Sequence, residues 1–208
     1  MNLNFMEAVQ ARRSIRKFTD QPVPRAMLEQ ILEAARLAPS GTNRQPWRFV
    51  LLTEASERRR LTGAVLQTFV TAAPALFVCC LDLKAFTRSG VAARLEELVD
   101  AGVFSREDLS VIYGSGIPEK VEDVKISAFT YLDLGIAVEH MALQAASLGL
   151  GSCWVRLFNP AQVREVLGLP PDIKVAALLP VGYPAQDPPP RPRLSLEELL
   201  LQPNWQQS

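Results

Sequence analysis

The spacing of hydrophobic and polar residues predicts amphipathic helices interleaved with short apolar strands. Between Pro24 and Pro39 apolar side chains recur at helical spacing, with one proline at the favoured first turn and the other at the end. Apolar runs at 49–52 and 75–81 are typical of buried strands. The same reasoning predicts further helices at 5–13, 55–67, 118–148 and 160–167, and further strands at 152–157 and 175–181.

The order of the predicted elements indicates an α+β fold in one domain over residues 1–183. The stretch 84–119 is less apolar, with helical pieces predicted at 91–99 and 106–113, and we interpret it as a helical excursion over the core. Residues 184–208 combine a dense proline cluster with an apolar segment that has little room for a core of its own. Such an extension is ordered only when it lies on something, so it either moves freely or wraps a partner subunit.

Composition and charge remove several classes of function. Lysine plus arginine and aspartate plus glutamate both number 22 in 208 residues, so no overall field draws the protein to nucleic acid or to an anionic membrane. No apolar run approaches the roughly 20 residues that a membrane-spanning helix needs, and the first residues lack a cationic segment followed by an apolar one. We therefore expect a cytoplasmic protein with neither a nucleic-acid nor a membrane partner.

The cysteines and the single histidine predict no metal centre. Cys79 and Cys80 are adjacent and Cys153 stands alone, so they form neither a disulfide framework nor a zinc-ligand spacing, and we expect all three to be buried. His140 falls within a mostly apolar predicted helix, where a core or surface histidine with satisfied hydrogen bonds is the simpler interpretation. No nucleophile in the sequence pairs with it to predict a catalytic triad.

Two basic segments predict an anion site. Residues 12–18 place arginines and a hydroxyl within about two helical turns at a helix end, and the planar arginine fork suits a phosphate group. A solvated basic helix end would explain this run on its own. Arg191 and Arg193, however, lie within a proline cluster whose rigid backbone would hold both guanidinium groups at a fixed spacing.

Two further segments have the composition of a site for a planar ligand. In the run 39–47, Gly41 permits close backbone approach and Asn43 offers an amide that suits the edge of a heterocycle, although a capped turn would have the same residues. In the run 149–155, glycines let a strand start tightly, and Trp154 either stacks on a ligand or fills the core. Neither run contains a dinucleotide-binding or P-loop pattern.

In this order and at these separations, the segments resemble the nitroreductase family of FMN-dependent enzymes. The most specific parts are the runs at 12–18, 40–47, 149–154 and 179–184, and the resemblance covers essentially the whole chain. One such run is a weak signal, whereas four in register are a specific one. The family implies a mostly antiparallel central sheet flanked by helices, in a domain-swapped homodimer joined through the long central helix and the C-terminal extension.

The resemblance also implies that FMN binds at the interface between the two subunits. The cofactor-binding residues that it implies are Arg12, Arg13, Ser14, Arg16, Pro39, Ser40, Gly41, Asn43, Gln67, Trp154, Val155, Arg156, Arg191 and Arg193. The arginines and Ser14 would reach the phosphate, the ribityl chain and the pyrimidine edge. The residues at 39–43 would come from the opposite subunit.

The activity implied by the resemblance is a two-step electron transfer. NAD(P)H is the co-substrate that reduces the flavin, and two electrons then pass to a small acceptor such as a nitroaromatic or a quinone. Arg16, near the pyrimidine carbonyl, would stabilise the anionic reduced flavin and raise its potential. No catalytic acid or base from the protein is required.

Two departures from the family pattern affect the expected site. Family members often have small residues where this chain has Arg156 and Leu157, so a backbone donor to the flavin edge would come from a bulky residue. The helix before the second strand lacks the lysine that some members aim at the flavin, which leaves Gln67 as a substitute. The excursion falls in the most variable region of the family, and we take Tyr113 and Phe129 as candidate substrate contacts.

Alternative functions remain open at this point. Relatives of similar fold carry out reductive dehalogenation or oxidative fragmentation of the flavin. The bulky residues at 156–157 also suit a flavin-binding sensor or store without turnover, and a structural dimer without cofactor would pair the arginines with the 22 acidic residues. A bound flavin that pyridine nucleotides reduce would favour the enzyme over both binding proteins.

Overall fold

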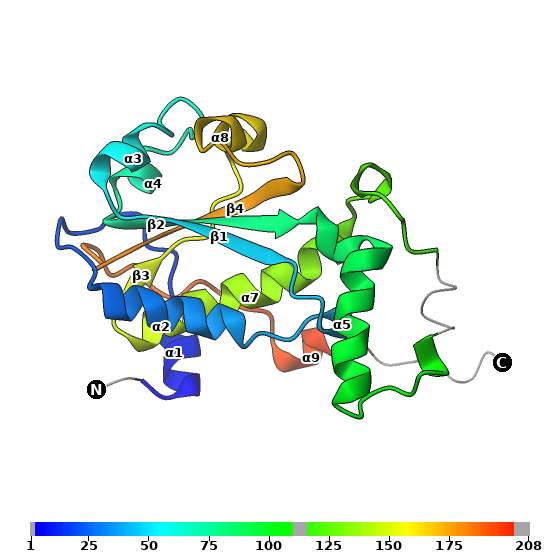
Figure 1. The fold of residues 1–208 in the computed structure, drawn as a ribbon. Helices are drawn as coiled ribbons and strands as arrows, with labels where there is room; N and C mark the ends of the chain where they lie inside the picture. Colours follow the sequence, from blue (N-terminus) through cyan, green and yellow to red (C-terminus); the bar gives the residue numbers. More distant parts are fainter. Residues whose placement is uncertain (1–2, 110–115, 202–208) are drawn as a thin grey trace.

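A four-stranded antiparallel sheet forms the centre of the computed structural model, which describes residues 3–109 and 116–201 (Figure 1). The strands lie in the order β1-β2-β4-β3, and each neighbouring pair is antiparallel. Their bounds are Trp47–Leu52 for β1, Ala75–Asp82 for β2, Gly151–Ser152 for β3 and Ile173–Gly182 for β4. The expected α+β fold with a mostly antiparallel sheet is confirmed.

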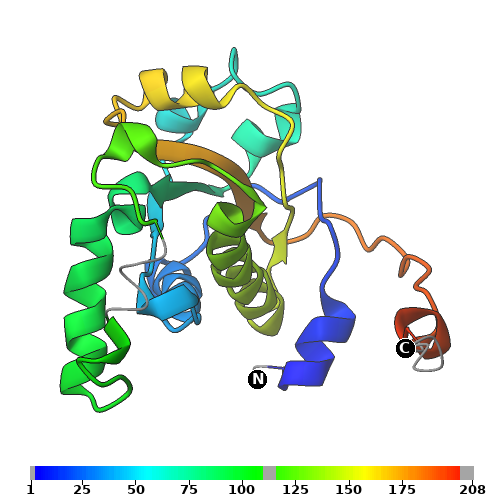
Figure 2. The ribbon, with the colours of Figure 1, turned by 90° about the vertical axis from the view of Figure 1, so that its right-hand side faces the viewer.

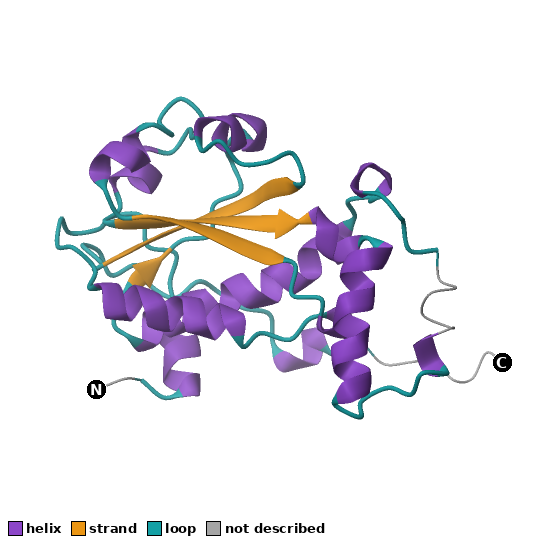
Figure 3. Ribbon diagram, in the orientation of Figure 1, coloured by secondary structure: helices purple, strands orange, loops and turns teal. Residues whose placement is uncertain are grey.

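Helices cover both faces of the sheet (Figures 1 and 3). One face packs against α2 (Arg25–Arg36) and α7 (Ala128–Ser147), and the other against α3 (Ala55–Arg59), α4 (Thr68–Ala72) and α8 (Pro160–Val166). Outside these layers, α1 (Phe5–Ala11) packs on α7, and α5 (Arg88–Asp100) packs on the 3₁₀ turns η1 (Gly41–Asn43) and η2 (Leu83–Phe86). The described residues also include the short elements η3 (Val121–Asp123) and α9 (Leu196–Leu199).

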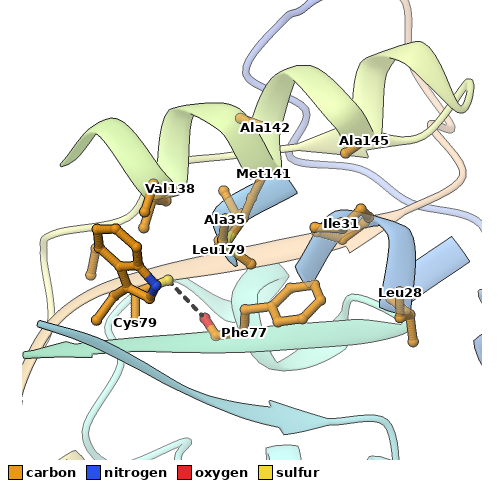
Figure 4. Packing of buried hydrophobic residues seen from close by; sticks show 14 of the residues in the cluster. Leu28, Ile31, Ala35, Phe77, Cys79, Val138, Met141, Ala142, Ala145 and Leu179 are labelled. Carbon is orange, nitrogen blue, oxygen red and sulfur yellow. Dashed lines mark hydrogen bonds between the residues drawn. The ribbon is translucent and has the colours of Figure 1, made fainter. Parts of the chain in front are cut away.

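Strand β2 supplies side chains to both halves of the core. Phe77 and Cys79 point toward α2 and α7, where Met141 and Leu28 pack on the sheet (Figure 4). The intervening residues of β2, such as Val78, point to the opposite cluster, because successive strand residues face opposite sides. A strand covered on both faces is apolar throughout, which explains why its sequence is a continuous hydrophobic run.

The three cysteines are buried structural residues, as expected. Burial raises the pKa of Cys80 to about 12, and it also raises the pKa values of Cys79 and Cys153. Thiols with raised pKa values are protonated at neutral pH and react poorly as nucleophiles.

The long central helix is shorter than the predicted helix at 118–148. Helix α7 begins only at Ala128, where Ser127 and Thr130 form a capping box in which the Ser127 backbone N–H donates to Thr130 Oγ1 at 3.0 Å. The capping box fixes this start, because it satisfies backbone donors that a longer helix would have paired internally. Upstream, Val121 and Val124 occupy helical spacing in the sequence but lie in η3 and an extended residue after it.

The predicted helix at 55–67 and the predicted strand at 152–157 are also broken. Arg58 is buried, and its guanidinium donates to the carbonyl oxygens of Thr53 and Thr71, which draws the chain into a turn between α3 and α4. Strand β3 stops after two residues; beyond it the Cys153 N–H donates to the Pro180 carbonyl of β4 at 3.3 Å, and Val155 forms an isolated bridge with Leu178. Local side-chain contacts therefore decide these boundaries more than hydrophobic spacing does.

Other predicted boundaries are closer to the structure. The first helix ends at Ala11, two residues before the predicted end, and its start has the expected capping box of Asn4 and Glu7. Helix α8 has the expected cap, in which Asn159 Oδ1 accepts from the Gln162 backbone N–H at 3.1 Å. The helix predicted at 106–113 extends outside the described residues.

The segment after α1 forms backbone hydrogen bonds with β3 and with the start of the C-terminal extension. The Ile15 N–H donates to the Ser152 carbonyl of β3 at 2.9 Å, and the Thr19 N–H donates to the Tyr183 carbonyl at 2.9 Å. Ile15 is buried against Gly151, where an added Cβ would lie only 2.7 Å from the Ile15 side chain. The segment thus runs between the short strand β3 and the first residues of the extension.

The C-terminal extension leaves the body of the molecule as an arm that ends at α9 (Figure 2). Every residue from Pro189 to Leu201 is exposed, and the leucines in this range show between 61% and 93% of their surface. Apolar side chains in such numbers on one arm indicate a surface that is covered in another state of the protein.

No helix in the described ranges combines the length and apolarity needed to cross a bilayer. The cytoplasmic location stays a prediction.

Gly151→Ala should lower the free energy of unfolding by about 1–3 kcal/mol, because the new methyl group overlaps Ile15 in a packed interior. Urea denaturation measures the change. Gly63→Ala is the matched control, since a Cβ there meets only the end of the Gln162 side chain at 3.4 Å. Equal midpoints for the two variants would contradict the close packing of Ile15 on Gly151.

Candidate functional site

Five arginines line a groove of about 630 Å³ between the segment after α1 and the C-terminal extension. Arg12, Arg13 and Arg16 come from the first segment, and Arg191 and Arg193 come from the second, so the two predicted basic segments meet. The remaining lining residues are Val9, Gln10, Ser14, Gln186, Pro188, Pro189 and Pro190. We call this the arginine groove; no acidic side chain is among the described residues that line it.

A bridge through Glu139 of α7 fixes one wall of the arginine groove. The Glu139 carboxylate lies 3.3 Å from Arg12 Nε and accepts a hydrogen bond from Trp154 Nε1 at 2.9 Å. Arg12 is therefore held against α7, and the indole ring of Trp154 is held in the same network. A carboxylate that forms an ion pair with one side chain and accepts a hydrogen bond from the other limits the rotamers available to each of them.

A buried, uncharged thiol lies beside Ser14. Burial raises the pKa of Cys153, and nearby Arg16 and a hydrogen bond with Ser14 partly offset the effect. Ser14 also forms a parallel bridge with Ser152 of β3. These contacts place Ser14 and Arg16 beside the end of β3. Strand β3 itself follows the turn that begins at Gly149.

The turn at 40–45 is strained and held by its own side chains. Thr42, Asn43 and Gln45 all have φ between 45° and 50°, which L residues seldom adopt. Ser40 Oγ accepts from the Gln45 backbone N–H at 3.0 Å. Backbone strain of this kind costs of order 1–3 kcal/mol per residue and is concentrated at functional sites.

A buried carboxylate ties this turn to the central helix. The Gly41 N–H donates to Asp133 Oδ1 at 3.1 Å, and Asp133 shows only 8% of its surface. An added Cβ at Gly41 would meet nothing within 4 Å, so the backbone there faces open space. Pro39 and Gly41 are exposed, and Ser40 and Asn43 are half-buried.

Within one chain the strained turn is not part of the arginine groove, since none of the residues at 39–43 lines it. Trp154 adjoins the groove through Glu139, whereas Gln67 caps α4 and does not line the groove. The N–H and C=O of Val155 both pair with Leu178, each at 2.9 Å. Within one chain, the residues of the arginine groove and the residues at 39–43 therefore form two separate sets.

The residues that depart from the expected pattern lie at the surface. Arg156 is exposed, and Leu157 shows 60% of its surface. Phe129 is 82% exposed and lines a different cavity, together with Arg44. Tyr113 lies outside the described residues.

The arginine groove suits the phosphate end of FMN. Among the described arginines of the groove, Glu139 pairs with Arg12 alone, so the other four cations of the groove repel one another, and a phosphate dianion relieves the repulsion while accepting charge-assisted hydrogen bonds. In the part of the chain that the structure describes, no cluster of three or more histidine, cysteine or acidic side chains could hold a metal ion. The donor set therefore fits an anionic organic ligand better than a cation.

Comparison with known proteins extends this argument to the whole chain. The sequence model of the nitroreductase family matches residues 9–183. A protein of Thermus thermophilus named NADH dehydrogenase is 34% identical over 96% of this chain and 96% of its own length.

This chain belongs to the nitroreductase family.

Solved structures of nitroreductase-like proteins agree with the fold. A protein of Exiguobacterium sibiricum solved in complex with FMN is 27% identical, covers 97% of this chain and 98% of its own, and superposes with a TM-score of 0.78. The NADPH:FMN oxidoreductase of Vibrio harveyi, solved with NAD⁺, is 26% identical, covers 99% of this chain and 80% of its own, and has a TM-score of 0.70.

The sequence of this nitroreductase-family chain did not predict a role for three polar residues. Glu139 and Asp133 lie on α7 amid apolar neighbours, where a charged residue in a mostly buried helix is the only signal that could have singled them out. Arg44 lies inside one of the family-like runs, but its contacts depend on η2, which is distant in sequence.

Glu139→Leu should lower the free energy of unfolding by about 1 kcal/mol, because Trp154 loses its hydrogen-bond acceptor and Arg12 loses an ion pair that is partly screened by solvent. Glu139→Gln keeps a side-chain oxygen for Trp154 and should cost about half as much. Urea denaturation followed by tryptophan fluorescence measures both. A leucine variant as stable as the parent protein would show that the bridge adds no stability.

Proposed function

We propose that this FMN-dependent NAD(P)H oxidoreductase works as a homodimer in which the arginine groove of one subunit and the strained turn of the other enclose the flavin. The observation that supports this most is the arginine groove, in which five arginines from two segments at opposite ends of the chain line one space. The proposed electron acceptor is a nitroaromatic, a quinone or a similar small molecule. When bound, FMN supplies the two-electron carrier between NAD(P)H and that acceptor.

The arginines would hold the phosphate end of the cofactor. Arg191 and Arg193 are exposed on the extension, and Arg193 Nη1 donates to the neighbouring Pro192 carbonyl at 3.3 Å. Arg13 donates to the backbone carbonyls of Gln10 and Arg12, which leaves its remaining donors for a ligand. Ser14 adds a hydroxyl beside them, and Arg16 would lie toward the pyrimidine edge and favour negative charge there.

The second subunit would supply Pro39, Ser40, Gly41 and Asn43. Two features support this division of the site. The turn faces open space in the single chain, and its strained backbone is fixed by Asp133 and its own side chains before any ligand binds. A preformed turn costs little ordering free energy on association.

Exposed apolar surfaces supply the material for a dimer interface. Phe5 and Met6 of α1 are 70% and 55% exposed, and Leu132 of α7 is 57% exposed, next to Phe129 on the same half of that helix. The leucines of the extension add an apolar arm of the kind that wraps a partner. Together these surfaces exceed the scattered exposed residues that monomers normally carry.

Arg193→Ala and Arg16→Ala should each raise the Kd for FMN about tenfold or more, because each removes a charge-assisted contact to a phosphate or a developing charge. Fluorescence quenching of added FMN measures the constant at two salt concentrations, and the parent protein should lose affinity at the higher one.

Arg25→Ala is the matched control for these two variants. Arg25 is exposed on α2 and pairs with Glu29 at 2.8 Å, outside the arginine groove. Unchanged FMN affinity in both groove variants would sink the assignment of the phosphate site.

Replacing Leu194, Leu196 and Leu199 by serine should weaken dimer formation and FMN retention together, because the arm loses the apolar surface that would bind the partner. Sedimentation velocity should show the parent protein at twice the 23.0 kDa chain mass. A parent protein that sediments as a monomer while retaining FMN would contradict the shared site.

A further inference from the structure

A second cavity lies beside the strained turn. Its volume is about 380 Å³, and it is lined by Arg44 of the turn, by residues of η2 and α5, and by the chain that leads into α7. The lining residues that matter here are Arg44, Phe86, Ile117, Val124, Lys125 and Phe129. The volume lies near the lower end of the range for small-molecule sites, which suits a ligand of one or two rings.

The guanidinium of Arg44 is poorly satisfied within this cavity. Its Nε is buried and has no hydrogen-bond partner among the described residues, and its Nη2 makes only a long contact of 3.4 Å to Thr42 Oγ1. The group lies over the ring of Phe86, with Cζ 5.1 Å from the ring centroid. An aromatic face fixes the orientation of a guanidinium, but it does not replace a hydrogen-bond acceptor.

Cations near Arg44 differ in having carboxylate partners. Arg48 lies 2.9 Å from Asp82, and Lys84 lies 2.8 Å from Asp172. No carboxylate of the described residues lies within 4.0 Å of Arg44. Arg44 is therefore an oriented, partly desolvated guanidinium that no carboxylate of the described residues neutralises.

The walls around Arg44 combine apolar surface with a second cation. Phe86, Ile117, Val124 and Phe129 offer rings and aliphatic groups, and Lys125 adds positive charge at the start of α7. Asp123 is the one acidic side chain among the described lining residues. A planar apolar body with one anionic group would match both the walls and the unpaired guanidinium.

We propose that this cavity binds small aromatic carboxylates, with the carboxylate on Arg44 and the ring between Phe86 and Phe129. The inference rests on the proposed function for its role in the reaction, because Arg44 belongs to the turn that would face the partner's flavin. In that dimer an aromatic carboxylate bearing a reducible nitro group is the acceptor. In each two-electron turnover NAD(P)H supplies a hydride and solvent supplies one proton. One N–O bond of the nitro group breaks and its oxygen leaves as water, so that nitro group, NAD(P)H and H⁺ give nitroso group, NAD(P)⁺ and water.

Benzoate binding tests the site without any turnover. Isothermal titration calorimetry on the FMN-loaded protein should give a Kd for benzoate about tenfold lower than for the neutral isostere benzamide. Arg44→Gln should remove this preference, and Arg44→Lys, which keeps the charge without the planar fork, should retain part of it. Arg94→Gln is the matched control, because Arg94 pairs with Glu97 at 2.7 Å on α5 and does not line the cavity.

Turnover with matched acceptors separates this inference from the proposed function. With NADH as donor, the ratio of kcat/KM for 4-nitrobenzoate over 4-nitrobenzamide should fall about tenfold in Arg44→Gln and stay constant in Arg94→Gln. A protein that reduces both acceptors with no charge preference would overturn the inference and leave the oxidoreductase intact. Charge-dependent benzoate binding without flavin reduction would overturn the proposed function and leave the cavity intact.

Two further outcomes would also overturn the inference. If benzamide binds the parent protein as tightly as benzoate, Arg44 does not select an anion, and this comparison needs no variant to fold. If Arg44→Gln lowers kcat/KM for NADPH relative to NADH while benzoate binding is unchanged, Arg44 reads the nucleotide phosphate instead. The ratio of NADPH to NADH turnover should be the same in the parent protein and Arg44→Gln.

Discussion

The contact between Ile15 and Gly151 sets the position of the arginine groove. Only a hydrogen fits between the Gly151 backbone and the Ile15 side chain, and this lets the segment after α1 lie flat against the end of β3. Its backbone then pairs with Ser152 on one side and with the start of the extension on the other. Arginines from the two ends of the sequence therefore reach one groove, because the segment after α1 is held between β3 and the start of the extension.

Helix α7 links the two halves of the candidate site. Glu139 holds Arg12 and Trp154 at the arginine groove, while Asp133, less than two turns away on the same helix, holds the strained turn. The helix itself is fixed by its apolar face, which packs with α2 on the sheet. Core packing thus fixes the helix that bears these two carboxylates, and the carboxylates orient backbone and side-chain donors. The proposed dimer would bring these donors to a shared ligand.

Much of the fold follows from the sequence, and the exceptions have local physical causes. The doubly covered strands β2 and β4 are visible as apolar runs, and the caps at Asn4 and Asn159 mark helix starts. The start of α7 was misplaced because valines at helical spacing precede the real cap at Ser127. The turn between α3 and α4 depends on the buried Arg58, whose acceptors the sequence cannot show.

The candidate site was predicted in part. Charge and rigidity were enough to associate Arg191 and Arg193 with the first basic segment, because both features are local. The tethers at Glu139 and Asp133 and the unpaired Arg44 depend on contacts between distant segments. Spacing along one chain gives no information about such contacts, and even less about a surface that a second subunit would complete.

The visible absorption spectrum of the purified protein, recorded before and after anaerobic addition of NADPH or NADH, tests the central claim most directly. We predict a yellow protein whose flavin bands bleach when the nucleotide is added. A protein that stays colourless after incubation with FMN, or a bound flavin that neither nucleotide reduces, would contradict the account.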